Sequence, residues 1–362
     1  MESDSFSLNE FGIGSTVTIG NDVTREFIDS KFKSYGYYIV SKRISTLYPD
    51  LVAHIRDDNT GYVESIPDGE EAKSLESYSM VIQHMIERNV DRDSFVSYIG
   101  GGTIGDMAGF VASTYKRGIT LEAFPTTLLA MVDSAIGGKN ALNHGLVKNV
   151  IGTFYDPANI VCDISFLNTL NRREFLEGVP EIIKYGLISD PGILPLLSSP
   201  EFTVTRDPEV LKKIIKRSIM IKSSFVSGDV HDTKGKRTVL NLGHTLAHAL
   251  ESASHNKLSH GISVAEGIVF EAFVSLRKGV CTRDTFQYVL DIVKSAGIDL
   301  PDTAGFDPHE LIRFIENDKK SVSGSVNMPL IRIPGQIITL RIPVAEIESM
   351  LVQFNGIDLN GI

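Results

Sequence analysis

Apolar residues along the chain follow two different periods, and the change between them falls near the middle. In the first half, short β-type runs occupy residues 15–19, 37–40, 95–99 and 121–124, and helical stretches such as residues 71–89 separate several of them. Strands that alternate with helices are typical of a largely parallel sheet. We therefore predict an N-terminal α/β domain.

The second half of the chain has a helical period. From about residue 171, apolar residues recur at three- and four-residue spacing, which predicts helices that bury one face. Residues 208–227, 239–252 and 264–278 continue this pattern, whereas residues 328–342 resemble a β segment. We place the domain boundary near residue 170, so that residues 1–170 form the α/β domain and residues 171–362 form a mostly helical domain.

The composition is that of a globular protein with small partners. A chain of 362 residues exceeds the size at which one hydrophobic core usually stops growing, which agrees with two domains. The formal net charge of −10 and the lack of a long Lys/Arg run argue against a nucleic-acid or anionic-membrane surface. Cys162 and Cys281 are too few for a disulfide framework or a thiolate zinc site, so any metal must use histidine and carboxylate ligands.

The N-terminal residues are acidic and polar, where a signal peptide needs a basic end and an apolar stretch. No apolar run approaches the roughly 18 residues that span a bilayer. The sequence therefore predicts a soluble cytoplasmic protein with no membrane partner, in a compartment whose reducing conditions suit two free cysteines.

A glycine-rich turn follows the β-type run at residues 95–99. Gly100, Gly102 and Gly105 fit the GxGxxG spacing, and the pattern changes there from β-type to helical. Glycines at such a turn let the backbone approach a pyrophosphate, whose charge is favoured by free N–H groups at the helix start. This predicts a nucleotide site, with a plain glycine turn as the alternative. Because the usual Rossmann fingerprint opens its domain, this late position also predicts a fold other than a standard Rossmann dehydrogenase.

Three histidines and one glutamate form a candidate metal site. His244 and His248 are four residues apart, on one face of a predicted helix, and His260 precedes another helical segment. Histidines on adjoining helices can share one ion, and Glu181 is the best carboxylate donor in the sequence. The spacing alone does not decide which histidines bind the metal, and purely structural histidines are the alternative. No glutamate directly follows the first histidine, which disfavours a zinc protease.

Arg117, Lys139 and Lys148 lie among glycine and threonine residues between Tyr115 and Asn149 of this acidic chain, and together with three basic residues further along they could hold an anion. Arginine suits bidentate binding of carboxylate or phosphate groups. A solvated surface is the alternative for each of them, but such a surface gains nothing from neighbours such as Gly137 and Gly138. The set therefore predicts a strongly anionic small substrate. It comprises Arg117, Lys139, Lys148, Lys184, Lys222 and Arg237.

Together these motifs resemble the dehydroquinate synthase family. The resemblance is dense from Pro67 to Gly267, which is over half of the chain. It implies an NAD-binding α/β domain, a mostly helical metal- and substrate-binding domain, and a homodimer with a divalent metal, zinc or cobalt, between the domains. The motifs that carry it, in the family's order, are Gly100–Asp106, Thr114–Gly118, Pro125–Ala130, Val132–Ser134, Gly137–Lys139, Lys148–Asn149, Glu181–Lys184 and Asn241–His244.

The resemblance also implies roles for individual residues. The metal ligands would be Glu181, His244 and His260, which leaves His248 to form hydrogen bonds or handle protons. NAD+ would be bound by Glu70, Lys73, Gly100, Gly101, Gly102, Asp106, Thr126, Thr127, Lys148, Phe166 and Thr169. The substrate would be bound by Arg117, Asp133, Lys139, Asn149, Lys184, Lys222, Arg237, Asn241 and Lys319. The catalytic set would be Lys139, Asp232, His248, Arg237 and Asn241.

The implied reaction converts 3-deoxy-D-arabino-heptulosonate 7-phosphate to 3-dehydroquinate and phosphate, in the shikimate pathway of aromatic amino-acid biosynthesis. A ring hydroxyl is oxidised by NAD+, phosphate leaves by β-elimination, the ketone is reduced again, and the opened enol closes in an intramolecular aldol. The metal would polarise the hydroxyl and carbonyl oxygens. Binding would hold the reacting groups in position, which removes the entropic cost of bringing them together. An enzyme of this kind is a carbon–oxygen lyase.

Three other functions fit parts of the sequence. Sister cyclases that make inosose or valiolone rings share the fold, metal and NAD, but they tend to alter the positions of Asn241 and His248, which this chain retains. A metal-dependent polyol dehydrogenase would need no phosphate cradle, so Lys148, Lys184 and Arg237 argue against it. The intact metal and basic positions disfavour a non-catalytic NAD- or metabolite-binding regulator.

Three positions depart from the family pattern. The stretch between Lys222 and Arg237 is slightly longer than usual, and Asp232 is the best match in it to an active-site glutamate. Ile262 stands where a glutamate usually follows the last of the three histidines. The strand that ends at Ser41 lacks the aspartate that commonly meets the adenosine ribose.

Overall fold

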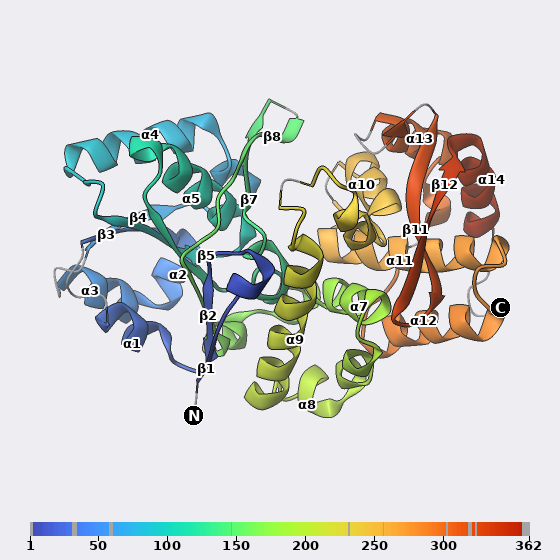
Figure 1. Ribbon diagram of the computed structural model, residues 1–362, viewed down its shortest axis with the longest axis horizontal. Helices are drawn as coiled ribbons and strands as arrows, with labels where there is room; N and C mark the ends of the chain where they lie inside the picture. Colours follow the sequence, from blue (N-terminus) through green and yellow to red (C-terminus); the bar gives the residue numbers. More distant parts are fainter. Residues whose placement is uncertain are drawn as a thin grey trace. The chain divides into compact units, whose positions relative to one another are not determined.

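The computed structural model describes residues 3–30, 35–57, 61–145, 147–230, 232–255, 257–301, 303–317, 321–322 and 324–356 (Figure 1). The chain forms two compact units, one of residues 1–175 and 211–233 and the other of residues 176–210 and 234–362. The boundary near residue 170 stays a prediction. Within the described residues, no helix is both long enough and apolar enough to cross a membrane.

A seven-stranded sheet organises the first unit. Its order is β1-β2-β9-β6-β5-β3-β4, and every neighbouring pair is parallel except β1 and β2. The interior strands β3 and β5 are buried along their whole length, as expected when helices cover both faces. The strands are β1 (Asp4–Ser7), β2 (Thr16–Gly20), β3 (Gly36–Ser41), β4 (Gly61–Ile66), β5 (Phe95–Gly100), β6 (Thr120–Pro125) and β9 (Asn159–Asp163).

Helices lie on both faces of this sheet, with α4 and α5 on one side and α1 and α3 on the other (Figure 1). On the second side, Ile28, Ile44 and Ile55 pack with Tyr38 and Val40 of β3 in one apolar core. The helices of the unit are α1 (Thr24–Asp29), α2 (Lys42–Leu47), α3 (Pro49–Asp57), α4 (Leu75–Glu87), α5 (Gly102–Thr114), α6 (Arg172–Leu176) and α9 (Pro208–Val226). The parallel α/β architecture agrees with the predicted fold class.

A two-stranded hairpin of β7 (Lys139–His144) and β8 (Val147–Phe154) was not predicted from the apolar pattern. Most of β8 is exposed, so the strand carries no continuous apolar face that would reveal it. The register of the hairpin shifts between Leu142 and His144, so that Asn143 of β7 faces residues 148–150 and the β-bulge lies in β8.

The second unit is mostly helical, as predicted, and is built around α11, which is buried along nearly its whole length. Helices α7, α10, α12 and α14 and strand β11 pack against it. The β segment predicted at 328–342 is an antiparallel pair, β11 and β12. The elements are α7 (Val179–Ile188), α8 (Pro200–Thr203), α10 (His244–Ala253), α11 (His260–Arg277), α12 (Arg283–Ser295), α13 (Pro308–Asn317), β10 (Ser321–Val322), β11 (Ser325–Ile333), β12 (Gln336–Pro343) and α14 (Val344–Asn355).

The predicted helix over residues 239–252 is interrupted. A short 3₁₀ helix covers Lys236–Asn241, and α10 begins only at His244. Gly243 separates them with a φ of 83°, a left-handed conformation that glycine adopts readily and that ends helical geometry. The break places the first histidine at the start of a helix.

Glu266 of α11 is a buried carboxyl whose Oε2 atom has no hydrogen-bond partner within the described part of the chain. Burial raises the pKa of Glu266 from 4.5 to about 8. The folded protein therefore keeps a proton that the unfolded chain has already released. Between pH 4.5 and 8 the contribution of Glu266 to the free energy of unfolding falls as the pH rises, and this loss stops above pH 8.

Replacing Glu266 by glutamine should remove this loss. We expect Glu266→Gln to match the wild type near pH 5 and to exceed its free energy of unfolding at pH 8 by on the order of 3–5 kcal/mol. Denaturant unfolding at both pH values measures the difference, with the exposed Glu316→Gln as control. An equal effect of Glu266→Gln at both pH values would contradict the prediction.

Candidate active site

Close helix packing in the second unit positions the predicted metal ligands. A Cβ on Gly267 of α11 would lie 1.8 Å from the carbonyl oxygen of Gly243, so the two backbones touch where α10 begins. The Gly243 amide also donates to Oε2 of Glu271 at 2.8 Å. At the start of α11, the Gly261 amide donates to Oε2 of Glu177, just before α7, at 2.8 Å. The starts of α7, α10 and α11 are thereby held together.

The side chains of Glu181, His244 and His260 converge at these three helix starts, with ligand atoms that all lie within 4.8 Å of one another. The Nε2 atoms of His244 and His260 each lie 3.3 Å from the same carboxylate oxygen, Oε1 of Glu181. His248 is exposed and lies outside this group. The structure thus brings together the three side chains predicted as ligands, whose assignment as ligands stays a prediction.

The second nitrogen of each histidine has its own acceptor. Nδ1 of His244 lies 3.1 Å from the carbonyl oxygen of Leu242, and Nδ1 of His260 lies 2.9 Å from Oε1 of Glu251. Donation from Nδ1 leaves the Nε2 lone pair for a metal, as is usual for metal-bound histidine. Glu251 of α10 thus supplies the carboxylate that is missing at Ile262.

The electrostatics of this group suit a cation. Burial alone would raise the pKa of Glu181, but Lys184 and His244 lower it well below its usual value. Burial lowers the pKa of His244 to about 4. Burial opposes a charge on His260 as well, yet hydrogen bonds to Glu181 and Glu251 raise its pKa to about 10. The group therefore holds an ionised carboxylate and a neutral imidazole, and Glu181 and Glu251 favour positive charge at His260, which a metal at Nε2 would supply in place of the proton.

The glycine turn of the first unit connects β5 to α5. Strand β5 ends at Gly100 and α5 begins at Gly102, as the sequence pattern predicted. The Thr126 amide donates to the Gly100 carbonyl at 2.9 Å, which ties the ends of β5 and β6 together. A Cβ on Gly102 would lie 2.7 Å from Oγ of Ser134, so only glycine leaves space there. The first turn of α5 is open for an anion at its free amides.

Lys73, a predicted NAD+-binding residue, bonds both to Asp106, which is also predicted to bind NAD+, and to Asn149, which is predicted to bind the substrate. Its Nζ atom pairs with Oδ2 of Asp106 at 2.6 Å and donates to Oδ1 of Asn149. Burial raises the pKa of Asp106, and the charge of Lys73 opposes this effect. Lys73 itself is 3% exposed, and lysine is rarely so buried unless it is paired.

Two further ion pairs join predicted substrate residues of the first unit. Nζ of Lys222 lies 3.0 Å from Oδ1 of Asp133 and donates to the Asp133 carbonyl at 2.7 Å. Nζ of Lys139 donates to Oδ2 of Asp232 at 2.7 Å. Asp232 belongs to the stretch between Lys222 and Arg237, which departs from the family pattern. The second pair places its carboxylate beside Lys139.

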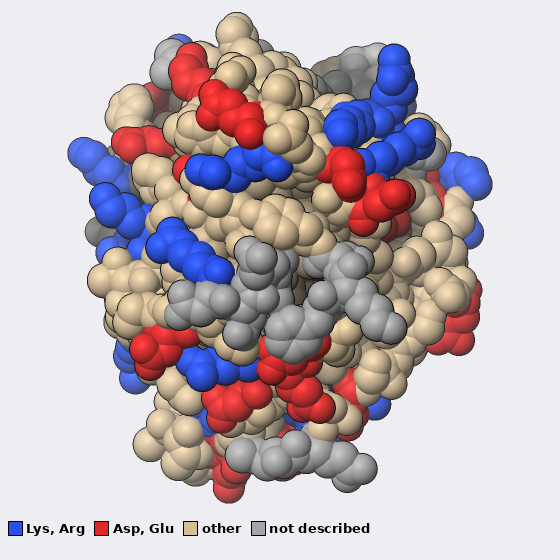
Figure 2. Space-filling model, turned by 90° about the vertical axis from the view of Figure 1, so that its left-hand side faces the viewer, with Lys and Arg blue, Asp and Glu red and all other residues tan. Residues whose placement is uncertain are grey.

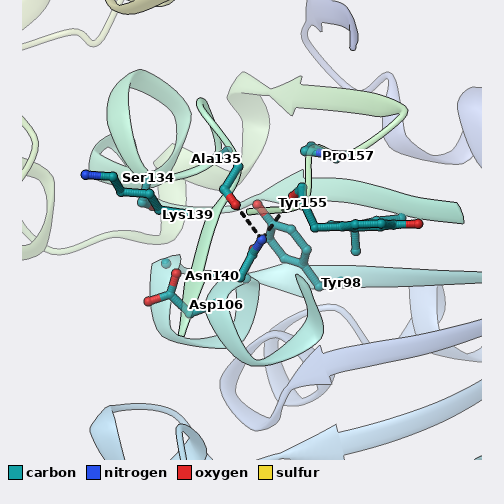
Figure 3. Close-up of a pocket in the computed structure, with 12 residues that line it drawn as sticks. Tyr98, Asp106, Ser134, Ala135, Lys139, Asn140, Tyr155 and Pro157 are labelled. Carbon is teal, nitrogen blue, oxygen red and sulfur yellow. Dashed lines mark hydrogen bonds between the residues drawn. The ribbon is translucent and has the colours of Figure 1, made fainter. Parts of the chain in front are cut away.

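A small pocket lies beside the glycine turn and is lined by Gly102, Gly105, Asp106 and Lys139, among others (Figure 3). Asn140 also lines this pocket. Its Nδ2 donates to the carbonyl oxygens of Gly138 and Tyr155 at 2.8 and 2.9 Å. These bonds hold the Gly137–Lys139 turn in place. Sequence reasoning missed Asn140, although an asparagine directly after a Gly-Gly-Lys turn is a signal for side-chain bonding to the backbone.

The remaining predicted residues have varied surroundings. Lys184 and Arg237, in the second unit, are buried cations, and Lys184 pairs with Glu181. Arg117 and Lys148 are exposed and Asn241 is partly buried, while Phe166 lies in the apolar core of the first unit. Thr169 accepts at its carbonyl from Arg43 at 3.3 Å, and Glu70 and Thr127 each make a hydrogen bond. Lys319 lies outside the described residues.

Charges on the face drawn in Figure 2 are mixed, with acidic and basic side chains interspersed. Several basic side chains adjoin one another at the upper right of this view, with acidic side chains next to them.

Solved structures share the fold of the whole chain. A 2-deoxy-scyllo-inosose synthase, solved with carbaglucose-6-phosphate, NAD+ and Co2+, has a TM-score of 0.83 at 22% identity, over 97% of this chain and 99% of that one. The 2-epi-5-epi-valiolone synthase of Streptomyces hygroscopicus, solved with NAD+ and Zn2+, has a TM-score of 0.84 at 23% identity, over 94% and 97%. The fold is therefore that of the sugar-phosphate cyclases.

Sequence comparison identifies the family within this class. Residues 63–177 match the family described as 3-dehydroquinate synthase N-terminal, and residues 178–321 match 3-dehydroquinate synthase C-terminal. The 3-dehydroquinate synthase of Thermoplasma volcanium is 38% identical over 343 residues, 94% of each chain. That of Picrophilus torridus is 41% identical over 292 residues, 80% of this chain and 83% of the other. The chain belongs to the 3-dehydroquinate synthase family of enzymes, which confirms the resemblance inferred from its motifs.

Proposed function

We propose that this enzyme is a 3-dehydroquinate synthase, which converts 3-deoxy-D-arabino-heptulosonate 7-phosphate to 3-dehydroquinate and phosphate. The observation that carries the proposal is the Lys139–Asp232 ion pair, because it supplies a carboxylate where the sequence departs from the family. With Asp232 in place, each group that the reaction needs has a candidate in this chain.

The donor set fits a divalent metal and a dinucleotide. Glu181, His244 and His260 offer one carboxylate and two imidazole nitrogens, which suits zinc or cobalt with open positions for substrate. The glycine turn and the loop of Glu70 and Lys73 offer backbone amides and charge to NAD+. Bound there, the two groups would supply a Lewis acid and a transient hydride acceptor.

Each unit carries buried cationic side chains that suit an anionic group, such as a carboxylate or a phosphate. Lys222, Lys184 and Arg237 are at most 8% exposed. Lys222 pairs with Asp133 and Lys184 with Glu181, so an arriving anion meets preorganised donors rather than flexible surface chains. Asp133 lies beside Lys222 and Asp232 beside Lys139, and both carboxylates can accept hydrogen bonds from substrate hydroxyls. The substrate we propose is accordingly a doubly anionic sugar acid.

The proposal extends to the reaction class and the setting of the enzyme. It would be a carbon–oxygen lyase of the shikimate pathway, acting as a homodimer in the cytoplasm, with a small anionic sugar phosphate as its partner. The net charge of −10 and the two buried free cysteines support a reducing compartment without nucleic-acid partners.

Product analysis tests the proposal directly. Purified protein with NAD+, a divalent metal and the heptulosonate phosphate should release phosphate and 3-dehydroquinate in equal amounts, without net formation of NADH. A reaction mixture free of dehydroquinate would sink the assignment. Ring closure of a heptulose or hexose phosphate to valiolone or inosose would favour a sister cyclase, and NADH accumulating from unphosphorylated polyols would favour a dehydrogenase.

The strand that ends at Ser41 lacks the aspartate that commonly contacts the adenosine ribose. We propose that Asp68 makes this contact instead. Ser41, the last residue of β3, donates through Oγ to Oδ1 of Asp68, and the Arg43 amide donates to Oδ2 at 3.0 Å. Strand β3 lies next to β5, which ends at the glycine turn. A carboxylate at the end of the neighbouring strand is the usual partner of the ribose 2′-hydroxyl, and it repels the 2′-phosphate of NADP+. The charge of Arg43 is shared between Glu174, with which it is paired, and Asp68.

Neutralising Asp68 should weaken the preference for NAD+ over NADP+. We expect the ratio of the NADP+ dissociation constant to the NAD+ dissociation constant to fall about tenfold in Asp68→Asn. The variant loses the repulsion between the Asp68 carboxylate and the 2′-phosphate of NADP+. The variant keeps an acceptor for Ser41, and Asp68→Glu, which keeps the charge, serves as control. Calorimetric titration measures both constants, and an unchanged ratio in Asp68→Asn would exclude Asp68 as the discriminating residue.

A further inference from the structure

Asn143 of β7 lies opposite the β-bulge of β8 and is outside the regular ladder of the hairpin there. Its backbone amide donates instead to the carbonyl oxygen of Lys73, at 2.7 Å. Bulges commonly redirect a side chain toward a functional site. The shift in register leaves the backbone amide of Asn143 to bond the loop that carries Glu70 and Lys73.

Both side-chain groups of Asn143 are used. Nδ2 donates to Oε2 of Glu70 at 2.7 Å, and Oδ1 accepts from the backbone amide of Asn149 at 2.9 Å. The side chain of Asn149 in turn accepts from Nζ of Lys73. Lys73, Asn143 and Asn149 thus form a closed ring of hydrogen bonds, to which Glu70 is attached.

The ring holds a strained backbone in place. Asn149 has a φ of 54°, a left-handed conformation that a non-glycine residue adopts at a cost unless its surroundings hold it. Its own amide is bonded to Asn143, and its side chain to Lys73. The position of the Asn149 side chain therefore depends on where the nucleotide loop and Asn143 lie.

We propose that Asn143 is a positioning residue that couples the dinucleotide loop to Asn149, so that dinucleotide bound at Glu70 and Lys73 orders Asn149 for the sugar phosphate. The inference rests on the proposed function, which assigns Glu70 and Lys73 to NAD+ and Asn149 to the substrate. Because one ring of hydrogen bonds joins the two subsites, the first ligand to bind orders the residues of both. The second ligand then loses less free energy to ordering, which is the source of positive coupling between ligands.

Exchanging donor and acceptor between Asn143 and Glu70 tests the coupling. Asn143→Asp keeps the acceptor for Asn149 but sets a carboxylate against Glu70, so NAD+ should bind about tenfold more weakly. Adding Glu70→Gln restores a hydrogen bond of reversed direction, because the new amide can donate to the new carboxylate. We expect the double variant to bind NAD+ more tightly than Asn143→Asp alone, although Glu70→Gln by itself weakens binding.

Asn143→Ala removes both side-chain bonds. Both the NAD+ dissociation constant and the KM of the heptulosonate phosphate should rise about tenfold or more, with a smaller fall in kcat at saturation. Val147→Thr, an exposed position on the other strand of the hairpin, is the control and should leave all three unchanged. Circular dichroism and thermal unfolding report whether each variant is folded.

The outcomes separate this inference from the proposed function. If the wild type binds NAD+ and turns over the substrate, but Asn143→Ala changes neither constant by more than about twofold, the inference is wrong and the function stands. Additive effects in the cycle of Asn143→Asp and Glu70→Gln would overturn it equally. A wild type that binds no NAD+ would overturn the proposed function and the inference with it.

Discussion

Replacing His244 by alanine should abolish both metal retention and turnover. The imidazole is one of three donors whose ligand atoms lie within 4.8 Å, and its loss leaves a carboxylate and one histidine. Loss of a direct ligand should exceed the roughly 10–100-fold effect of removing an outer partner, so we expect metal affinity to fall by more than about 100-fold. Elemental analysis after dialysis measures the retained metal, and phosphate release measures turnover.

His309→Ala is a matched control for this experiment. His309 carries an imidazole on α13 whose side chain is 78% exposed and pairs with Glu348. Its removal should change neither metal content nor rate. Full metal occupancy in His244→Ala would show that the ligand set is wrong, and His248 would then be the next histidine to replace.

Asp232→Asn should lower kcat by about 10²- to 10⁴-fold, the range for loss of a positioned acid or base. Asp232 accepts from Lys139 at 2.7 Å, and the neutral amide can neither balance the lysine charge nor take up a proton. Because the glycine turn and the Glu181 group are untouched, NAD+ and metal should still bind. Steady-state kinetics together with the two binding assays separate these effects.

The length and charge of this side chain can be tested separately. Asp232→Glu keeps the carboxylate and introduces the residue that the family usually carries, so it should retain far more activity than the amide. Asp50→Asn, on the exposed surface of α3, is the control for loss of an acidic group. A kcat of Asp232→Asn within about tenfold of the wild type would remove Asp232 from the catalytic set.

Local signals predicted the features that depend on neighbouring residues. The glycine turn falls between β5 and α5 because a strand pattern meets a helical pattern there, and the turn itself needs small residues. The end of a helix at Gly243 is also a local effect of its positive φ, yet the helical period runs through it and misled the prediction. The β7–β8 hairpin was missed because its strands are mostly polar or exposed.

Residues that act through distant partners left no local signal. Glu251 supports His260 from another helix, and Asn143 joins Lys73 and Asn149 across a bulge. Neither contact follows from spacing, since each depends on how close two elements pack. Asp68, directly after a proline in the nucleotide loop, was visible in the sequence but could not be linked to Ser41 without the parallel pairing of β3 and β4.

The sequence by itself determined the α/β and helical halves, the nucleotide turn, and a set of histidine, glutamate and basic residues, because periodicity and motif spacing are local properties of a chain. Which histidines converge was decided only by tertiary structure. The close approach of Gly243 and Gly267 puts His244 beside His260 and Glu181 and leaves His248 exposed. The partner of Lys139 was decided in the same way, since only the fold brings Asp232 within 2.7 Å of it, across more than ninety positions.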